Sequence, residues 1–268
     1  MSTAGYLHFG EPIYWEERYK FEWSKNHQVE CFDWYCRFDH VYHMIESVVD
    51  ATVAQTVLVV GVGRSNIIET LYKKGFTNIH AIDISPTIIH IMTEKYAGYD
   101  GVTFSVMDVR ELNGVPSSKY TVVIDKACID AVFCSTNFLA DSKQAFTEIY
   151  RVLGNGGIFI SFSHAPANCR VPFLRAAKWG IDVSPSSHGE GIFMYLLTRT
   201  DDQALLNKKV EGAESVVQVA VSHAVTSLDQ PLVKSSQTRN KQNAGFVTVT
   251  ASVDVLTDMV NESEDVDS

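Results

Sequence analysis

The stretch TVLVVGVGRS, which runs from Thr56 to Ser65, decides the fold of this 268-residue chain. It begins as an apolar, β-branched run of the kind found in strands that are buried on both faces. It ends in a glycine-rich turn, after which Ser65 can cap a helix that runs to Lys74 and stops at Gly75. A buried strand, a tight turn and a helix in this order are typical of a βαβ unit.

The same alternation of strands and helices continues along the chain. Amphipathic patterns predict helices after Ser85 and over residues 141–153, and apolar runs predict further strands between them. The predicted strands after the first are Asn78–Asp83, Val102–Val106, Tyr120–Asp125, Ile158–Phe162 and Phe193–Thr198. We therefore predict an α/β fold with a doubly wound, mostly parallel sheet and helices on both faces. Ligands bind such sheets at the carboxyl ends of the strands.

Composition divides the chain into three predicted segments. Residues 1–50 are unusually aromatic and are expected to form a helical cap, and residues 51–200 carry the α/β pattern. Residues 201–268 contain one of the 29 aromatic residues, Phe246, together with 11 acidic and 5 basic residues. So little aromatic mass can hardly offset the entropy that is lost on folding. We expect a largely flexible acidic extension, with a small second domain as the alternative.

Charge and composition argue against several classes of function. The formal net charge of −10 disfavours general affinity for nucleic acids. No apolar run approaches the roughly 20 residues of a membrane span, and the first residues lack a signal-peptide pattern. The five cysteines form no Cys-x-x-Cys pair, and the nine histidines show no metal-ligand spacing. We expect a cytoplasmic protein with reduced thiols, no bound metal and no membrane contact.

The residues that follow the first two strands indicate a nucleoside ligand. Gly61 and Gly63 allow a tight turn and a close approach of the backbone to a ligand. Asn66 stands where a dinucleotide fingerprint has its third glycine, so the feature associated with a diphosphate is missing. Asp83, 20 positions beyond Gly63, can accept hydrogen bonds from both ribose hydroxyls.

A second carboxylate, Asp108, follows the third strand. It can accept the exocyclic amine of an adenine while the backbone amide of Val109 faces the ring. Taken singly, these features also fit a plain turn, a helix cap and a loop carboxylate. Taken together, two acids and a shortened glycine turn fit an adenosyl ligand without a diphosphate, and S-adenosylmethionine is the obvious candidate.

The fourth strand and the N-terminal segment offer candidates for the reactive end of such a ligand. Asp125 and Lys126 end the strand, where the pair either faces the ligand or forms a salt bridge. Asp125 is the candidate catalytic residue, because it could take a proton from an acceptor amine or orient it. The aromatic residues of the first 50 positions either pack in the core or present their faces to a sulfonium cation.

Six motifs follow one another in a recognisable order: YWEERY at 14–19, FDWY at 32–35, LVVGVGRS at 58–65, IDIS at 82–85, MDVR at 107–110 and DKACIDA at 125–131. Between Glu11 and Thr200 the chain thereby resembles the class I methyltransferases that modify lysines of elongation factor 1-alpha, in particular the group of the endothelin-converting enzyme 2 locus. The resemblance implies a seven-stranded sheet with an antiparallel last strand. It also implies S-adenosylmethionine as cofactor and a methyltransferase domain over residues 51–200.

The resemblance further implies a set of cofactor-binding residues from the N-terminal segment and the strand ends. These are Trp15, Tyr19, Trp34, Gly61, Asp83, Ile84, Asp108, Val109 and Lys126. Within this set, Asp83 and Ile84 would hold the ribose. Asp108 and Val109 would hold the adenine, and Lys126 would contact the cofactor near the fourth strand.

Three departures from the family pattern keep alternatives open. Arg64 replaces Asn, Ala127-Cys128 replaces Gly-Thr, and the stretch from Tyr19 to Trp34 is a few residues longer. The favoured function is methylation of a lysine in elongation factor 1-alpha or a similar protein, carried out by a monomer. The alternatives are a small-molecule methyltransferase and an inactive cofactor-binding module. An aminopropyl transferase is disfavoured, because no acidic cluster for polyamine cations is evident after the fourth strand.

Overall fold

The computed structural model describes residues 9–26, 30–46, 48–174, 179–185 and 191–201. Of the predicted acidic extension, 201–268, all but Asp201 lies outside these residues, so its flexibility stays a prediction. The proposed boundaries at residues 50 and 200 likewise stay predictions. Within the described residues, no helix is both long and apolar enough to cross a membrane.

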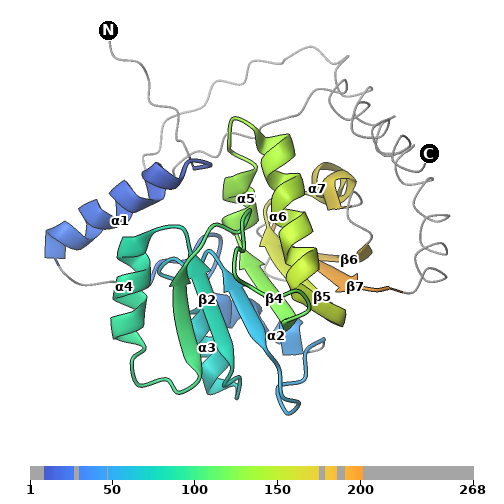
Figure 1. Ribbon diagram of the computed structural model, residues 1–268, viewed down its shortest axis with the longest axis horizontal. Coiled ribbons are helices and arrows are strands. Elements are labelled where there is room, and N and C mark those ends of the chain that lie inside the picture. The colour runs from blue at the N-terminus through green and yellow to red at the C-terminus, as the bar shows by residue number, and fades with distance from the viewer. Residues whose placement is uncertain (1–8, 27–29, 47, 175–178, 186–190, 202–268) are drawn as a thin grey trace, which may run out of the picture. The chain divides into compact units, whose positions relative to one another are not determined.

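The described strands form one sheet, which runs through the centre of Figure 1. The strands are β1 Val57–Val60, β2 Ile79–Asp83, β3 Val102–Val106, β4 Tyr120–Lys126, β5 Leu153–Ser163, β6 Trp179–Pro185 and β7 Phe193–Arg199. Their order in the sheet is β3-β2-β1-β4-β5-β7-β6. Neighbours from β3 to β5 are parallel, and β7 is antiparallel to both β5 and β6. The prediction of a doubly wound, mostly parallel α/β fold is confirmed.

Seven helices occur among the described residues: α1 Pro12–Asn26, α2 Phe38–Glu46, α3 Ile67–Lys73, α4 Pro86–Lys95, α5 Cys128–Val132, α6 Phe138–Val152 and α7 Ala167–Leu174. Buried side chains of α2, α3 and α4 join one cluster with every second residue of β1, Val57 and Val59. Because successive strand residues point to opposite faces, these three helices share one face of the sheet. The buried side of α6 packs outside that cluster, and Figure 1 shows α6 in front of the sheet.

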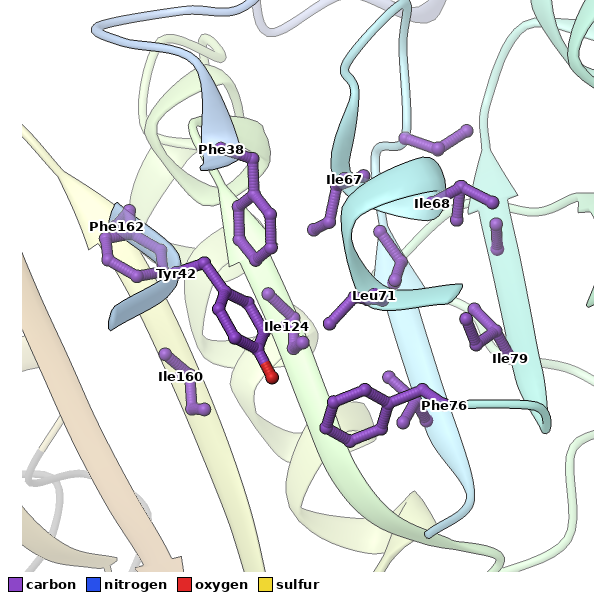
Figure 2. Close-up of a cluster of buried hydrophobic side chains, with 14 of the residues drawn as sticks. Phe38, Tyr42, Ile67, Ile68, Leu71, Phe76, Ile79, Ile124, Ile160 and Phe162 are labelled. Atoms are coloured by element: carbon purple, nitrogen blue, oxygen red, sulfur yellow. The ribbon is translucent and has the colours of Figure 1, made fainter. Parts of the chain in front are cut away.

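The main core joins the N-terminal segment to the sheet. Figure 2 shows Phe38 and Tyr42 of α2 beside Ile124 of β4 and Ile160 of β5. Phe38 is fully buried, and burying a side chain of that size stabilises a fold by about 1.5–3 kcal/mol. Part of the predicted N-terminal cap is therefore core, which fixes the loop between α1 and α2 against the sheet.

The fifth strand begins earlier than the predicted start at Ile158. The structure already begins β5 at Leu153, and the pairing with β4 shifts register between Tyr120 and Val122. The strand β6 was not specified from the sequence. Its segment, WGIDVSP, has apolar residues at every second position, but it is short and carries the glycine and proline that weaken a strand pattern and are tolerated at the edge of a sheet.

Candidate cofactor site

A cavity lies at the carboxyl ends of the central strands, where the fold predicts ligand binding. It is lined by residues from the turn after β1, the ends of β2 and β4, the loop after β3 and the N-terminal segment. Every residue predicted to bind the cofactor lines it: Trp15, Tyr19, Trp34, Gly61, Gly63, Asp83, Ile84, Asp108, Val109 and Lys126. The structure thus brings together ten residues spread over 112 positions of sequence, and their contacts with the cofactor remain predictions.

The turn after β1 requires its two glycines. Gly61 and Gly63 have φ angles of +62° and +47°, in the left-handed region that favours glycine. A Cβ atom on Gly61 would lie 2.5 Å from the Cβ of Cys128, and one on Gly63 would lie 3.0 Å from the Tyr19 hydroxyl oxygen. The turn is therefore in close contact with the start of α5 on one side and with α1 on the other.

Asp83 is the carboxylate best suited to a ribose. It is 6% exposed, and it accepts hydrogen bonds from the amides of Gly63 (2.9 Å) and Ser85 (3.1 Å). No cation pairs with it among the described residues, and burial raises its pKa to about 6. A buried carboxylate at a cavity wall, without a cation, fits a ligand that donates two hydroxyl hydrogens. These features fit the ribose of S-adenosylmethionine.

Asp108 is less available than the sequence suggested. Both of its oxygens accept from the Arg110 guanidinium at 2.6–3.0 Å, and Arg110 also binds Asp141 at 2.6 Å. Arg110 lines the cavity too, although sequence reasoning assigned it no role. An adenine amine must therefore share this carboxylate with a guanidinium. The neighbouring Val109 is buried in the cavity wall, as predicted for the adenine end.

Lys126 has a clear structural role. Its side chain is 5% exposed, its Nζ lies 2.9 Å from Asp33 Oδ1, and it donates a 2.6 Å hydrogen bond to the carbonyl of Trp34. The alternative of a salt bridge is therefore correct, but the partner is Asp33 and not Asp125. Lys126 holds Trp34 against the cavity, and Asp33 compensates the charge that would otherwise repel a sulfonium.

The predicted catalytic role of Asp125 is not supported by its position. Asp125 is 1% exposed and does not line the cavity. It accepts hydrogen bonds from Ser161 Oγ (2.6 Å) and from the amide of Ile129 (3.1 Å), and burial raises its pKa to about 7. Because adjacent residues of a strand point to opposite faces, Lys126 reaches the cavity and Asp125 does not. Asp125 instead accepts from an amide at the start of α5, and its catalytic role stays a prediction.

The N-terminal aromatic residues surround a cation of the protein itself. The Arg18 guanidinium lies 5.4–5.6 Å from the ring centroids of Trp15, Phe32 and Trp34. Arg18 also donates to Glu22 at 3.1 Å, and Glu22 lies 3.2 Å from the guanidinium of Arg64. Both arginines line the cavity. Sequence reasoning left open whether the N-terminal rings pack in the core or face a sulfonium, and it missed Arg18, because only the folded chain shows which cation they face.

Glu16 fastens α1 to the rest of the site. Its carboxylate accepts from the Thr87 amide (3.2 Å), the Thr87 hydroxyl (2.7 Å) and the Ser85 hydroxyl. These donors belong to the first turn of α4, where unpaired amides and the helix dipole favour a negative charge. The hydrogen bonds lower the pKa of Glu16, while its burial opposes this with the largest single effect. Glu16 therefore places Trp15 and Tyr19 over the cavity.

The part of the chain that the structure describes contains neither a cluster of metal-ligating side chains nor a disulfide. No group of three histidine, cysteine or acidic side chains there could hold a metal ion, and all five cysteines are free thiols. Burial raises the pKa of Cys128 well above its usual value, so the cavity wall at this point is an unreactive thiol.

Comparisons with known proteins agree with this geometry. The sequence profile of the family described as "Methyltransferase domain" matches residues 58–161. The mouse protein "EEF1A lysine methyltransferase 4" is 24% identical over 242 residues, which cover 87% of this chain and 89% of the mouse protein. The Xenopus laevis protein "eEF1A lysine and N-terminal methyltransferase" is 30% identical over 175 residues, which cover 64% of this chain but 24% of that longer protein.

The fold has solved counterparts. The N-methyltransferase NodS from Bradyrhizobium japonicum, solved with S-adenosyl-L-homocysteine, superimposes with a TM-score of 0.52 at 12% identity, covering 70% of this chain and 99% of NodS. At that identity the likeness concerns the fold alone. The profile match extends from β1 to β5 and includes the glycine turn, Asp83, Asp108 and Lys126. The chain is a class I methyltransferase, and its cofactor is S-adenosylmethionine.

Proposed function

We propose that this chain transfers a methyl group to a lysine side chain of elongation factor 1-alpha or a similar protein. The observation that carries the proposal is the likeness to the mouse lysine methyltransferase along nearly the full length of both chains. The bovine relative of the same name covers 89% of this chain at 24% identity. The N-terminal motifs around Trp15 and Trp34, which lie outside the matched methyltransferase profile, line the same cavity as the profile residues.

The chemistry needs alignment more than acid–base catalysis. The bound cofactor supplies an electrophilic methyl group on a sulfonium, and its leaving thioether is neutral. An unprotonated acceptor nitrogen held in line with that methyl group would displace the neutral thioether and would then release a proton to solvent. Holding the two reactants in line can supply much of the rate enhancement.

The acceptor lysine must lose its proton before it can react. With an ordinary pKa near 10.4, presenting a neutral amine at pH 7 costs about 4.6 kcal/mol. Desolvation in a closed site disfavours the ammonium and offsets part of this cost. Asp125, the carboxylate of β4, is buried and does not line the cavity, so we assign deprotonation of the acceptor mainly to desolvation.

The charged side chains that line the cavity indicate where each end of the cofactor binds. We assign the ribose to Asp83 and the adenine to the Asp108–Val109 segment. The carboxylate of the methionine part then meets Arg18 and Arg64, which also line the cavity and share a single carboxylate, Glu22. In this arrangement the carboxylate of the ligand lies between the Arg18 guanidinium and the sulfonium. The two positive charges are therefore compatible.

A labelling experiment tests the proposal. The protein is incubated with S-adenosylmethionine carrying a labelled methyl group and with a cell lysate or purified elongation factor 1-alpha. Label on a lysine of that factor supports the proposal, whereas label confined to small metabolites supports the small-molecule alternative. Cofactor binding by calorimetry without any transfer supports the inactive module. We also propose that the chain acts as a cytoplasmic monomer, which light scattering and imaging of a tagged chain would test.

A further inference from the structure

A second cluster of side chains lies beside the cavity, at the carboxyl ends of β4 and β5. At its centre is Asp130 of α5, whose carboxylate accepts from the Ser163 hydroxyl (2.6 Å), the His164 amide (3.3 Å), the Tyr35 hydroxyl and the Arg170 guanidinium. None of these five residues lines the cofactor cavity. Their neighbours do: Trp34 precedes Tyr35, and Ala131 follows Asp130. The cluster is therefore next to the cofactor but separate from it.

The order of the strands shows which end of the cofactor faces this cluster. The adenine and ribose carboxylates follow β3 and β2, the glycine turn follows β1, and Lys126 ends β4. A ligand laid across these ends in sheet order has its adenine over β3 and its methionine part toward β4. The next strand end in that direction is β5, which ends at Ser163. The methyl group and the Asp130 cluster therefore lie at the same side of the site.

We propose that Tyr35 and His164 form the channel wall along which the acceptor lysine reaches the cofactor, and that the Asp130–Arg170 ion pair holds Tyr35 in place. This inference rests on the proposed function. The ring centroids of Tyr35 and His164 lie 4.1 Å apart in an edge-on arrangement. Tyr35 is half-buried and His164 is exposed. The pair thus extends from the cavity residue Trp34 to the protein surface.

The backbone conformation of Tyr35 and the buried charges beside it indicate that the position of this side chain is constrained. Its φ angle is +71°, a left-handed conformation that is unfavourable for a non-glycine residue. The Arg170 side chain is 5% exposed, and its Cζ lies 3.8 Å from the ring centroid of Phe133. A buried ion pair contributes little net stability, so such pairs are more informative about positioning than about folding. Here the Asp130–Arg170 pair orients the Asp130 carboxylate, which accepts a hydrogen bond from the Tyr35 hydroxyl.

The charges around the channel suit a lysine that must become neutral. Lys126 has Asp33 as its partner and Arg170 has Asp130, so each buried cation has its own carboxylate. An entering ammonium would find no uncompensated carboxylate among these groups. A long, unbranched side chain between aromatic rings would lose most of its hydration, which lowers the pKa of the amine. In this arrangement Asp130 and Arg170 are positioning residues, and Tyr35 and His164 would touch the acceptor.

The test separates acceptor binding from cofactor binding. His164→Ala removes an exposed ring and Tyr35→Phe removes the hydroxyl but keeps the ring. For each variant, kcat and KM are measured with purified elongation factor 1-alpha, cofactor affinity is measured by calorimetry, and Tm is measured by thermal unfolding. We expect kcat/KM for the acceptor to fall about tenfold in His164→Ala, mostly through KM, with cofactor affinity and Tm unchanged. Tyr35→Phe should lower kcat as well, because the ring loses its anchor.

A matched control is His90→Ala, because His90 is also an exposed histidine, with a side chain that is 69% exposed, but it lies on α4 and not in the Asp130 cluster. Unchanged kcat/KM in His164→Ala would overturn the proposal. So would a parallel loss of cofactor affinity and Tm in both variants, which would show a structural role. If the wild-type protein labels a different lysate protein, the proposed substrate is wrong and the same comparison is made with that protein. If it labels no protein at all, the channel is overturned together with the proposed function.

Discussion

The strand ends of the sheet form two halves that compensate their buried charges in different ways. In the β1–β3 half, which carries the glycine turn, Asp83 and Asp108, the buried carboxylate of Asp83 has no cation among the described residues. In the β4–β5 half, Lys126 and Arg170 each pair with a buried carboxylate, Asp33 and Asp130. Asp83 in the first half can still accept hydrogen bonds from a ligand, whereas the two buried cations of the second half already have their partners within the chain.

This difference shows that one edge of a sheet can both bind a ligand and hold segments of the chain together. A carboxylate left without a partner weakens the empty fold but gains when a ligand donates to it. Ion pairs that are complete within the chain fix the geometry of the segments they join, here the N-terminal loop and the sheet. Substitution of Asp83 should therefore affect binding more than folding, and substitutions that break the ion pairs of Lys126 or Arg170 should affect folding first.

The largest effect is expected from breaking the Lys126–Asp33 pair. Lys126→Met leaves Asp33, whose side chain is 2% exposed, as a buried carboxylate without a cation. Removing one member of a buried pair typically destabilises a protein by about 3–5 kcal/mol. Urea unfolding should show a loss of this order. The double variant Lys126→Met with Asp33→Asn should recover a large part of it, since no charge is left buried.

An exposed ion pair provides the control. Lys73→Ala breaks the pair with Glu69 on α3, where the two side chains are 67% and 38% exposed. Exposed pairs contribute about 0–1 kcal/mol, so unfolding should hardly change. A loss of under about 1 kcal/mol in Lys126→Met would contradict the view that the β4–β5 half is held together by its buried pairs.

The second prediction concerns the β1–β3 half. Asp83→Asn keeps an acceptor for the Gly63 amide but loses the charge, and its side-chain amide cannot accept from two ribose hydroxyls as a carboxylate does. Hydrogen bonds to a charged group contribute about 1.5–3 kcal/mol, so the Kd for S-adenosylmethionine should rise roughly tenfold to a hundredfold. Calorimetry measures this change. The free energy of unfolding without ligand should stay equal or increase, because a buried charge has been removed; a clear decrease would contradict the contrast between the halves.

The third prediction concerns how stability and cofactor affinity depend on pH through Asp83. Because burial raises the pKa of Asp83 to about 6, the folded protein holds its proton at pH values where the unfolded chain has lost it. The contribution of Asp83 to stability is therefore fully present below the unfolded pKa and is lost as the pH rises through about 6. Cofactor binding needs the ionised form and has the opposite sign. Affinity should fall about tenfold between pH 7 and pH 5.

Calorimetric titrations at several pH values measure this dependence, with Asp83→Asn as the reference. The variant has no ionisable group at this position, so its affinity should vary much less with pH. Equal pH dependence in both proteins would show that another group controls binding. Asp125, whose pKa burial raises to about 7, contributes to stability with the same sign as Asp83 but does not reach the ligand.

The two halves also differ in how far the sequence predicts them. Gly61, Asp83 and Asp108 each follow a strand with a strong apolar pattern, and parallel strands bring their carboxyl ends to one edge, so their meeting follows from local sequence. The β4–β5 half depends on contacts between segments that are 92 positions apart, such as Lys126 with Trp34. No local pattern encodes such a contact. The placement of Asp125 outside the cavity lining has a similar cause, because a difference of one residue in strand phase decides which side chain reaches the cavity.

The smallest predicted effect tests a strained residue within the β4–β5 half. Ala127 has a φ angle of +71°, a conformation that is unfavourable for alanine but not for glycine. Ala127→Gly relieves this strain but gives the unfolded chain more freedom, and the net gain should be about 0.5 kcal/mol. Urea unfolding can resolve it. Ala131→Gly, four positions on and inside α5, should instead lose about 1 kcal/mol, because glycine is unfavourable within a helix. Opposite signs at these two alanines would show that the strain lies in the turn after β4; two losses would place Ala127 among the residues that the turn accommodates without strain.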